Sequence, residues 1–237
     1  MFRTIYAALY IVALTLGTYP RLLKMKKLPK DMPAIEKDKL VHQTPNSFGQ
    51  GMLKATGSTV TVEGLENIPQ DRSVLFVANH QSNFDIPLLM GYLPKPFGFI
   101  SKVEVKKLPI VREWMVEMNS VFMDRSDRRQ SLRAIKDGIE LLKNGHSLLI
   151  FPEGTRSKGD AMEEFKTGSF HLAVKSGVPI VPITISGTHK IYESNGNRVK
   201  PGHVKLIISE PLFMEDMKDL EIKEIAKLTE ERVASKL

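Results

Sequence analysis

From residue 59 onward, the chain alternates short runs of β-branched and aromatic residues with longer amphipathic stretches. The short runs, each predicted to be a strand, are residues 59–63, 73–78, 97–101, 120–124, 147–151, 178–185 and 203–209. Strands that are separated by helices form parallel or mixed sheets, and the helices cover the faces of the sheet. We therefore predict an α/β fold, a single domain with a largely parallel or mixed central sheet flanked by helices.

The clearest predicted helix covers residues 128–143. Its apolar residues recur at every third or fourth position, namely Leu132, Ile135, Ile139 and Leu142. Two further helical patterns cover residues 166–175 and 215–236. No internal repeat or low-complexity linker divides this part of the chain, so residues 58–237 are predicted to be one domain.

The positive charge of the chain is concentrated near its N-terminus. The 237 residues carry a formal net charge of +7, and residues 1–60, with nine Lys and Arg against three Asp and Glu, contribute +6. A nucleic-acid-binding domain needs basic residues spread over a folded face, so we expect no nucleic-acid partner. The chain has no cysteine, which excludes a disulfide framework, a thiolate zinc site and a cysteine nucleophile.

Residues 4–19 form an uncharged apolar stretch, which Pro20 and a basic cluster follow. As a helix this stretch would be about 24 Å long, short of the roughly 30 Å hydrocarbon core of a bilayer, and we expect Pro20 to end it. A cleaved signal peptide is one alternative, but the basic cluster follows the apolar run and no cleavage pattern precedes it. A core helix of a soluble domain is another. We favour a helix held in one leaflet, on the cytoplasmic face of the cell membrane.

Residues 33–56 contain a second helical pattern. Pro45, Gly49 and Gly51 interrupt it, so we expect an irregular helix. We expect the two helices to pair as a hairpin that lies on the membrane. Residues 1–57 are therefore predicted to be an N-terminal membrane-associated helical segment that precedes the α/β domain.

The segment Asn79–Asp85, of sequence NHQSNFD, directly follows a predicted strand. His80 and Asp85 meet only if the chain turns sharply and Asp85 begins a following helix, since in an extended chain they lie roughly 17 Å apart. A carboxylate on one imidazole nitrogen leaves the other nitrogen as a better base. The alternative is a buried histidine next to an aspartate that caps a helix.

The segment Phe151–Ser157, of sequence FPEGTRS, directly follows another predicted strand. Ligands of open α/β sheets bind beyond the carboxyl ends of the strands, which is where both polar segments lie. Gly154 permits a close approach of the backbone, and the planar guanidinium of Arg156 suits a phosphate. The alternative is an ordinary turn with a surface Arg–Glu pair.

NHxxxxD followed by FPEGTRS resembles the glycerolipid acyltransferase family, and in particular the 1-acyl-glycerol-3-phosphate (lysophosphatidic acid) acyltransferases of the PlsC type. Two further blocks of this family are present at Val121–Arg125 and Val178–Ile183. The four blocks occur in the order of the family and span residues 79–183, and the expected Phe-Lys-Thr-Gly follows the third block. The fourth block is expected to be a buried strand that supports the site.

The resemblance implies transfer of a fatty acyl group from acyl-CoA or acyl-carrier protein to the 2-hydroxyl of 1-acyl-glycerol 3-phosphate, which gives phosphatidate. It implies that His80 takes the hydroxyl proton and that Asp85 orients the imidazole. No acyl-enzyme, metal or cofactor is required. The expected partners are therefore a phospholipid membrane, lysophosphatidic acid and the acyl donor.

The resemblance also implies a set of substrate-binding residues. Arg156 would bind the substrate phosphate, with Glu153 and Gly154 shaping its loop. The remaining residues carried over from the family are Thr155 in the same block, Arg125 and Phe122 at the acceptor site, and Lys102 near the phosphate.

Two other functions stay open at this point. One is acylation of a different acceptor, such as glycerol 3-phosphate or another lysophospholipid, and the other is a non-catalytic membrane lipid-binding module. A Ser–His hydrolase based on Ser82 is not supported, since the GxSxG turn is missing. The pattern does not decide the acyl-chain length, the donor, the oligomeric state or whether Trp114 faces the core or the membrane.

Overall fold

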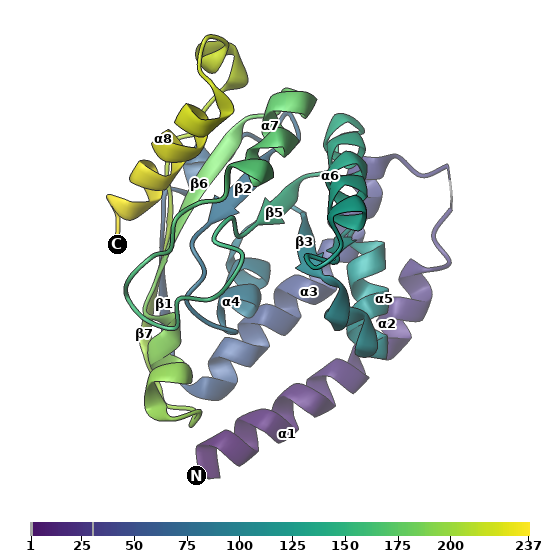
Figure 1. Cartoon of the computed structure of the whole chain (residues 1–237). Helices are drawn as coiled ribbons and strands as arrows, with labels where there is room; N and C mark the ends of the chain where they lie inside the picture. Colours follow the sequence, from purple (N-terminus) through teal and green to yellow (C-terminus); the bar gives the residue numbers. More distant parts are fainter. Residues whose placement is uncertain (1, 30) are drawn as a thin grey trace.

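The computed structural model describes residues 2–29 and 31–237, which form a seven-stranded sheet with helices on both faces (Figure 1). In chain order the elements are α1 (Phe2–Gly17), α2 (Tyr19–Met25), α3 (Ala34–Thr56), β1 (Thr59–Glu63), β2 (Leu75–Ala78), α4 (Asp85–Tyr92), β3 (Gly98–Lys102), α5 (Pro109–Glu117), β4 (Val121–Met123), α6 (Arg128–Lys143), β5 (Leu148–Ile150), α7 (His171–Ser176), β6 (Ile180–Ser186), β7 (His203–Ile208) and α8 (Ile222–Ala234). Short 3-10 turns lie at Leu65–Asn67, Val103–Lys107, Thr167–Phe170, Thr188–Ile191, Glu193–Asn195 and Met214–Met217.

The order of the strands in the sheet is β1-β7-β6-β2-β5-β3-β4. Strands β6, β2, β5, β3 and β4 run parallel to one another, because helices return the chain to the same end of the sheet between them. Strand β7 is antiparallel to β6, and β1 is parallel to β7. Each predicted strand overlaps an observed one. The predicted α/β fold with a mixed central sheet is confirmed.

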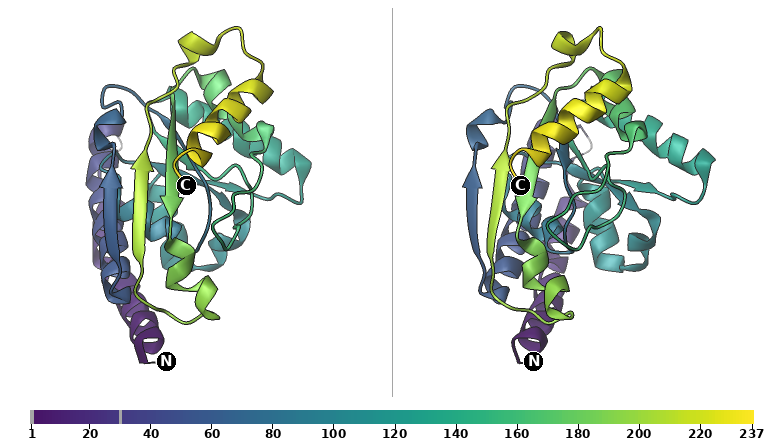
Figure 2. Two further views of the ribbon diagram at one scale, coloured as in Figure 1. Left: turned by 90° about the vertical axis from the view of Figure 1, so that its left-hand side faces the viewer. Right: turned by 60° about the vertical axis from the view of Figure 1, so that its left-hand side comes forward.

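The two faces of the sheet carry separate hydrophobic layers. Alternate side chains of β2 point to opposite faces, so that Phe76 packs towards α3, α4 and α5 while Leu75 and Val77 pack towards α6, α7 and α8. The two layers are visible in Figure 2, where α8 and α3 lie on opposite faces of the sheet. Both faces are covered, which is why the central strands β2, β5 and β6 are apolar along most of their length.

The N-terminal apolar helix α1 ends at Gly17, just before the proline that we expected to end it, and a second helix follows. The chain bends at Thr18 and becomes helical again in α2, with Pro20 in the first turn. Proline is tolerated there because the first helical N–H groups have no partner within the helix. Helix α1 has 16 residues, as many as the predicted segment, but with α2 it forms a bent helical stretch over residues 2–25 that, by length and apolar composition alone, could cross a membrane.

Helix α3 is continuous, although we predicted it to be irregular. Pro45 and the two glycines each lower the intrinsic stability of the helix. Packing against other helices outweighs this cost, because the glycines allow those helices to approach closely. A Cβ atom at Gly49 would lie 2.3 Å from the carbonyl oxygen of Pro87 in α4, and one at Gly51 would lie 3.1 Å from Leu14 in α1. Helix α3 thus lies between α1 and α4.

Two predicted helices near the C-terminus are each divided. Residues 166–175 begin as the 3-10 turn Thr167–Phe170 before α7, and residues 215–236 contain the 3-10 turn Met214–Met217 followed by α8. A capping box begins α8, since the Glu221 and Glu224 side chains each accept a backbone N–H of the first turn. The charged pattern alone did not show that α8 begins at Ile222 and not at residue 215.

Candidate active site

The two polar segments meet because the strands that precede them are neighbours in the sheet. Val77 of β2 pairs in register with Ile150 of β5. His80 and Glu153 each lie three residues beyond this pair, and the two chains leave the sheet at the same edge. Lys102 at the end of β3 pairs with Met123 of β4, which brings the segment after β4 to that edge as well. This edge is where ligands of parallel sheets bind.

His80 and Asp85 form a hydrogen-bonded pair. The distance between Nδ1 of His80 and Oδ2 of Asp85 is 2.7 Å. The chain turns sharply after β2, and Asp85 is the first residue of α4. The same carboxylate oxygen accepts the backbone N–H groups of Gln81 (2.7 Å) and Ser82 (2.9 Å). Asp85 is thus an acceptor, so Nδ1 of His80 carries a proton and Nε2 of the neutral ring is the basic nitrogen.

The surroundings of the pair hold it in place. The Asp85 side chain is fully buried, and its Oδ1 accepts a hydrogen bond from the Thr188 hydroxyl group. Four donors therefore compensate the cost of burying this charge. The His80 ring stacks on Phe151, with the ring centroids 3.9 Å apart. The orientation of the imidazole is therefore set by a carboxylate and by an aromatic face.

Glu153 lies behind the turn that carries His80. Its carboxylate accepts the backbone N–H of His80 and that of Glu163, the second at 2.9 Å. Burial raises the pKa of Glu153 to about 7, and the two N–H groups lower it in part. Glu153 is not among the residues that line the cavity. Its observed contacts hold the backbone of the two segments together.

Gly154 has a positive φ of +75°, a backbone conformation that favours glycine, and it lies next to two cationic side chains. A Cβ atom at this position would lie 2.7 Å from Nζ of Lys166 and 3.3 Å from Nη1 of Arg125. Arg125 also donates a hydrogen bond to the Gly154 carbonyl group. The ends of two cationic side chains therefore lie next to one backbone position, at which the positive φ is the feature that favours glycine.

Arg156 is held by Glu193, which lies in the 3-10 turn Glu193–Asn195. Nη1 of Arg156 is 3.3 Å from Oε1 of Glu193. The Glu193 carboxylate also accepts the Ser82 hydroxyl at 2.6 Å and the Asn83 backbone N–H at 3.0 Å. The arginine and the turn that carries the His80–Asp85 pair are thus joined through one carboxylate.

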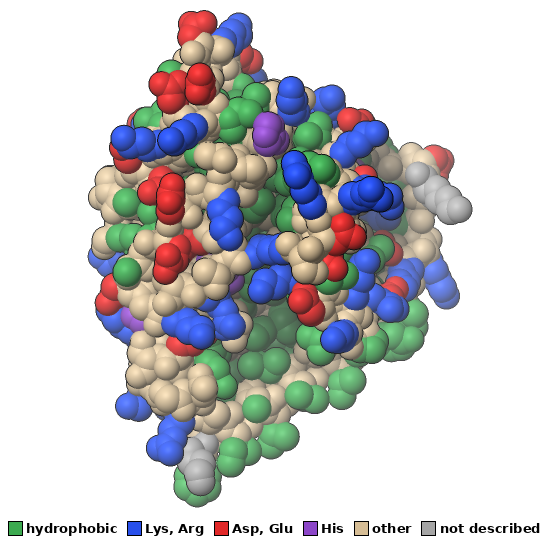
Figure 3. Space-filling model, in the orientation of Figure 1, with side chains coloured by type: hydrophobic (Ala, Val, Ile, Leu, Met, Phe, Trp, Pro, Cys, Tyr) green, Lys and Arg blue, Asp and Glu red, His purple; other side chains and the backbone are tan. Residues whose placement is uncertain are grey.

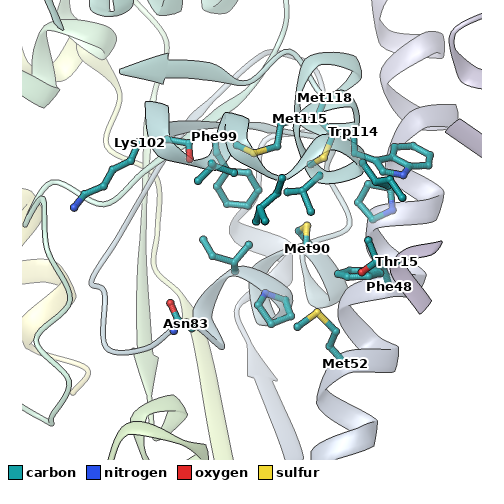
Figure 4. A pocket seen from close by; sticks show the side chains of 18 of the residues that line it. Thr15, Phe48, Met52, Asn83, Met90, Phe99, Lys102, Trp114, Met115 and Met118 are labelled. Atoms are coloured by element: carbon teal, nitrogen blue, oxygen red, sulfur yellow. The ribbon is translucent and has the colours of Figure 1, made fainter. Parts of the chain in front are cut away.

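A cavity of about 850 Å³ opens beside these residues. Its lining is mostly apolar and comes from α1, α3, α4 and α5. In Figure 3 a hollow lined by hydrophobic side chains lies next to a group of Lys and Arg side chains. Figure 4 shows Lys102 and Asn83 on one side of the cavity and Trp114, Phe48 and Thr15 on the other. The cavity therefore joins a polar side, next to the sheet edge, to an apolar side between the helices.

Most of the predicted site residues line this cavity. They are His80, Lys102, Arg125, Gly154, Thr155 and Arg156. Phe122 is not among the lining residues, and its ring instead lies under Nζ of Lys106, which is 4.9 Å from the ring centroid. The structure thus brings together His80, Asp85 and several cations, and it places Phe122 and Glu153 outside the lining.

Sequence reasoning missed two residues of this site, Thr188 and Glu193. Both follow β6, whose carboxyl end lies at the same edge of the sheet as those of β2 and β5. The rule that ligands bind beyond the carboxyl ends of strands could have directed attention to the segment after residues 178–185. Gly187, which has a φ of +90° and begins this segment, was the available signal.

The remaining histidines lie outside the cavity lining. His42 is buried and donates from Nε2 to the Leu93 carbonyl group at 3.0 Å, and burial lowers its pKa. His146 pairs with Asp38, with Nδ1 and Oδ2 2.6 Å apart. Within residues 2–29 and 31–237, no group of three or more His, Asp or Glu side chains is arranged to hold a metal ion.

Comparison with known proteins gives consistent matches. The family model described as Acyltransferase matches residues 59–186. The chain is 43% identical over 155 residues to a chloroplastic 1-acyl-sn-glycerol-3-phosphate acyltransferase of Arabidopsis thaliana, a match that covers 65% of this chain and 43% of the relative. It is 34% identical over 144 residues to an enzyme of the same name from Borreliella burgdorferi, covering 60% of this chain and 57% of that relative.

A solved structure extends the comparison to nearly the whole chain. The crystal structure of the 1-acyl-sn-glycerophosphate acyltransferase PlsC from Thermotoga maritima has a TM-score of 0.87 and 35% sequence identity, and the match covers 99% of this chain and 92% of that one. In contrast, the matched part of this chain spans less than half the length of the relatives from Arabidopsis thaliana, Brassica napus and Chlamydomonas reinhardtii. The family model covers more than half of the chain, and the site residues lie on the matching fold. The chain belongs to the acyltransferase family.

Proposed function

We propose that this chain moves a fatty acyl group from a thioester donor, acyl-CoA or acyl-carrier protein, to the 2-hydroxyl of 1-acyl-glycerol 3-phosphate, which gives phosphatidate. The observation that carries the proposal is the His80–Asp85 pair, where His80 lines an apolar cavity together with Arg156. A general base, a cation for a phosphate and an apolar cavity for hydrocarbon are the parts that this reaction needs. Relatives and a solved structure that share the family have this activity in their names.

His80 acts as the general base in the proposed reaction. Nε2 takes the proton of the 2-hydroxyl group as the oxygen attacks the thioester carbonyl carbon. The new C–O bond forms, the C–S bond breaks, and the proton passes from Nε2 to the departing thiolate. Asp85 accepts the hydrogen bond from Nδ1 throughout and stabilises the imidazolium ion. The acyl transfer changes no oxidation state and needs no further reactant. The two substrates and these side chains account for every atom and proton.

Arg156 binds the phosphate of the acceptor in this proposal. It lines the cavity on the same sheet edge as His80, and Lys102 and Arg125 line the cavity there as well. A guanidinium group forms bidentate hydrogen bonds with a phosphate. A phosphate held there would fix the distance between the glycerol hydroxyl group and Nε2 of His80. Orientation of this kind accounts for a large share of the rate in transfer reactions.

The apolar side of the cavity takes hydrocarbon in this proposal. Phe48, Met90 and Trp114 line it, and helices α1 and α3 form part of its wall. A volume of about 850 Å³ lies in the range that is typical of pockets for small-molecule ligands. The acyl chain would thus lie between the N-terminal helices and the sheet.

We also propose that α1 and α2 lie in one leaflet of the cell membrane, at its cytoplasmic face. The exposed apolar side chains of these two helices form one stripe, namely Phe2, Ile5, Tyr6, Leu9, Val12, Leu16, Tyr19 and Leu23. The opposite side packs on the protein, with Ala7 and Leu22 buried. An amphipathic helix next to basic residues is typical of a segment that lies in the membrane interface. This position would let lipid substrates reach the cavity directly.

Release of thiol from the donor tests the proposal. The purified full-length protein is mixed with 1-acyl-glycerol 3-phosphate and with palmitoyl-CoA or palmitoyl-acyl-carrier protein. We expect thiol release with at least one of the donors, and we expect His80→Ala to lower kcat by about a thousandfold. His171→Ala, which changes an exposed histidine of α7, is the matched control and should leave kcat unchanged.

Three outcomes would contradict parts of the proposal. No thiol release from the wild-type protein would contradict the enzymatic function. Near-normal turnover by His80→Ala would contradict the base assignment. A higher kcat/KM with glycerol 3-phosphate or lysophosphatidylcholine than with lysophosphatidate would show that the acceptor is a different one.

A further inference from the structure

Glu193 makes a set of contacts that the proposed mechanism does not explain. It follows β6 in the chain, 111 residues after Ser82 and 37 residues after Arg156, yet it contacts both. Its side chain is only 7% exposed. A carboxylate that is removed from water needs several donors, and Glu193 has three, namely the Ser82 hydroxyl group, the Asn83 backbone N–H and Nη1 of Arg156.

The three donors come from the two halves of the site. Ser82 and Asn83 belong to the turn between β2 and α4, which carries His80 and Asp85 at its ends. Arg156 belongs to the loop after β5. Glu193 is therefore a bridge between the segment that holds the base and the segment that holds the cation.

Arg156 keeps most of its binding capacity in this arrangement. Among the residues that the structure describes, it hydrogen-bonds only through Nη1, so Nε and Nη2 stay available to an anion. A long flexible side chain that is already held in one position loses less conformational entropy when it binds. The negative charge of Glu193 does not itself attract a phosphate, so any benefit to binding must come from the position that it gives to Arg156.

We infer that Glu193 is a positioning residue, which holds the Arg156 guanidinium group at a fixed place relative to His80 so that it receives the phosphate of the acceptor. This inference rests on the proposed function for the identity of the acceptor. It predicts that the effect of Glu193 on phosphate binding depends on Arg156. A carboxylate that served only the stability of the turn would not show that dependence.

Equilibrium binding of the acceptor tests the inference without any need for turnover. The chain has a single tryptophan, Trp114, and it lines the cavity. Its fluorescence can therefore report the Kd of the full-length protein for a short-chain 1-acyl-glycerol 3-phosphate, kept below its micelle-forming concentration. We expect Glu193→Ala to raise this Kd about tenfold, the usual size for losing a charge-assisted hydrogen bond. Glu193→Gln, whose amide oxygen can still accept from Arg156, should raise it less than about threefold.

The decisive comparison repeats the substitution without the arginine. In an Arg156→Ala background, Glu193→Ala should change the Kd by less than about twofold, because there is no guanidinium group left to position. Another tenfold increase in that background would overturn the inference. Glu210→Ala removes a carboxylate that lies 3.9 Å from Arg232 outside the site, and it should leave the Kd unchanged.

A second variant covers the case in which Glu193→Ala does not fold, as thermal unfolding would show. Glu193→Asp keeps the charge and withdraws the carboxylate by one methylene, and it should raise the Kd several-fold only when Arg156 is present.

A measurement of turnover separates this inference from the proposed function. Acceptor binding that depends on both residues, without thiol release, would contradict the acyl transfer and support the positioning role. Turnover together with independent effects on Kd would contradict the positioning role alone. A wild-type protein that does not bind the acceptor would overturn both.

Discussion

Three buried carboxylates hold the loops of the active site, and backbone N–H groups are donors to all of them. Asp85 accepts from Gln81 and Ser82, Glu153 from His80 and Glu163, and Glu193 from Asn83. Asp85 stabilises a tight turn of the chain, and Glu153 and Glu193 each join residues that are distant in the chain. A loop without regular structure is rigid when its N–H groups are bonded in this way. The position of His80 thus depends on hydrogen bonds to charged groups.

The hydroxyl group of Thr188 donates a hydrogen bond to the carboxylate of Asp85, to which the proposed mechanism gives a catalytic role. Thr188→Val removes the donor to Oδ1 of Asp85, so the buried charge loses one of its four hydrogen bonds. We expect kcat to fall about tenfold with little change in the KM of the acceptor, since substrate contacts are kept. Steady-state kinetics with lysophosphatidate measure both values.

Thr184 provides the matched control. It is a buried threonine of β6 whose hydroxyl group donates to the Val233 carbonyl group at 2.7 Å, away from the site. Thr184→Val should cost about 1 kcal/mol of stability and leave kcat unchanged. Equal losses of kcat in the two variants would contradict the role given to Thr188.

The raised pKa of Glu153 predicts a dependence of stability on pH. Burial raises this pKa from 4.5 to about 7. Between those values the folded protein holds a proton that the unfolded chain has released, so the contribution of Glu153 to stability falls as the pH rises. The loss is complete above pH 7 and amounts to about 3 kcal/mol at 1.36 kcal/mol for each unit.

Glu153→Gln removes the titration and tests this sign. The amide side chain has only one acceptor oxygen, so it can accept one of the two N–H groups that the carboxylate accepts. This loss changes the free energy of unfolding by an amount that does not depend on pH. Urea unfolding of both proteins at pH 5 and pH 8 gives the difference in the free energy of unfolding. We expect the wild-type protein to lose stability relative to the variant between these pH values. A difference that is the same at both would contradict the raised pKa.

At the scale of elements, the contact between α3 and α4 attaches the N-terminal helices to the sheet. Gly49 and Gly91 face each other there, and a Cβ at Gly49 would lie 2.3 Å from the Pro87 carbonyl oxygen and 2.6 Å from the Gly91 nitrogen. The atoms that it would meet belong to the backbone and cannot rotate away. The two helices are therefore packed at a distance that only glycine permits.

Gly49→Ala should consequently lower the free energy of unfolding by about 3 kcal/mol. Gly17→Ala is the control, since a Cβ there would meet no atom within 4 Å. Alanine at a helix end is as good as glycine or better, so this variant should be neutral or slightly stabilising. Chemical denaturation of the two variants checks the prediction, and similar losses in both would contradict the close crossing.

Helix α5 is joined to the bend between α1 and α2. Nε1 of Trp114 donates to the Thr18 hydroxyl group at 2.9 Å, and both residues are buried. The pattern left open whether this tryptophan faced the core or the membrane, and the structure places it in the core and in the cavity wall. The N-terminal helices and the cavity are therefore parts of one packing unit, and a displacement of α1 would change the cavity.

At the scale of the whole molecule, one side combines an apolar stripe with positive charge. The stripe runs along α1 at the lower edge of Figure 3. Lys26 and Lys37 next to it pair with Glu113 and Glu117 of α5, so part of the N-terminal charge is neutralised by the protein itself. Membrane binding should accordingly depend more on apolar contact than on charge, and 1 M salt should weaken it only in part.

Substitutions in the stripe test the orientation on the membrane. Ile5 and Leu9 are exposed and do not line the cavity. Changing both to Asp should lower binding to vesicles of phosphatidylglycerol and phosphatidylcholine more than about tenfold, with no loss of thermal stability. Leu132→Asp changes an equally exposed leucine of α6 and should leave binding unchanged. Sedimentation with vesicles measures both, and equal binding by all three proteins would contradict the proposed orientation.

Local sequence patterns were sufficient to predict a helix or strand wherever residues close together in the chain decide the structure. All seven strands follow from short runs of β-branched and aromatic residues, which fit an extended chain, and helix α6 follows from apolar residues at every third or fourth position. The same patterns did not show that Pro20 lies in the first turn of a second helix, and they were wrong about Pro45, which lies inside a continuous helix. Their local cost is outweighed by packing against residues that are far away in the chain.

The sequence by itself determined the α/β class, the positions of the seven strands and of helix α6, and the placement of the segments that carry His80 and Arg156 directly after strands, because these depend on short-range patterns. Only the tertiary structure decided which strands are neighbours, and therefore which loops meet. The pairing of β2 with both β5 and β6 brings Glu153, Thr188 and Glu193 into contact with the one segment Asn79–Asp85. That pairing is selected by the burial of two whole faces of the sheet, a property of the complete fold that no single segment contains.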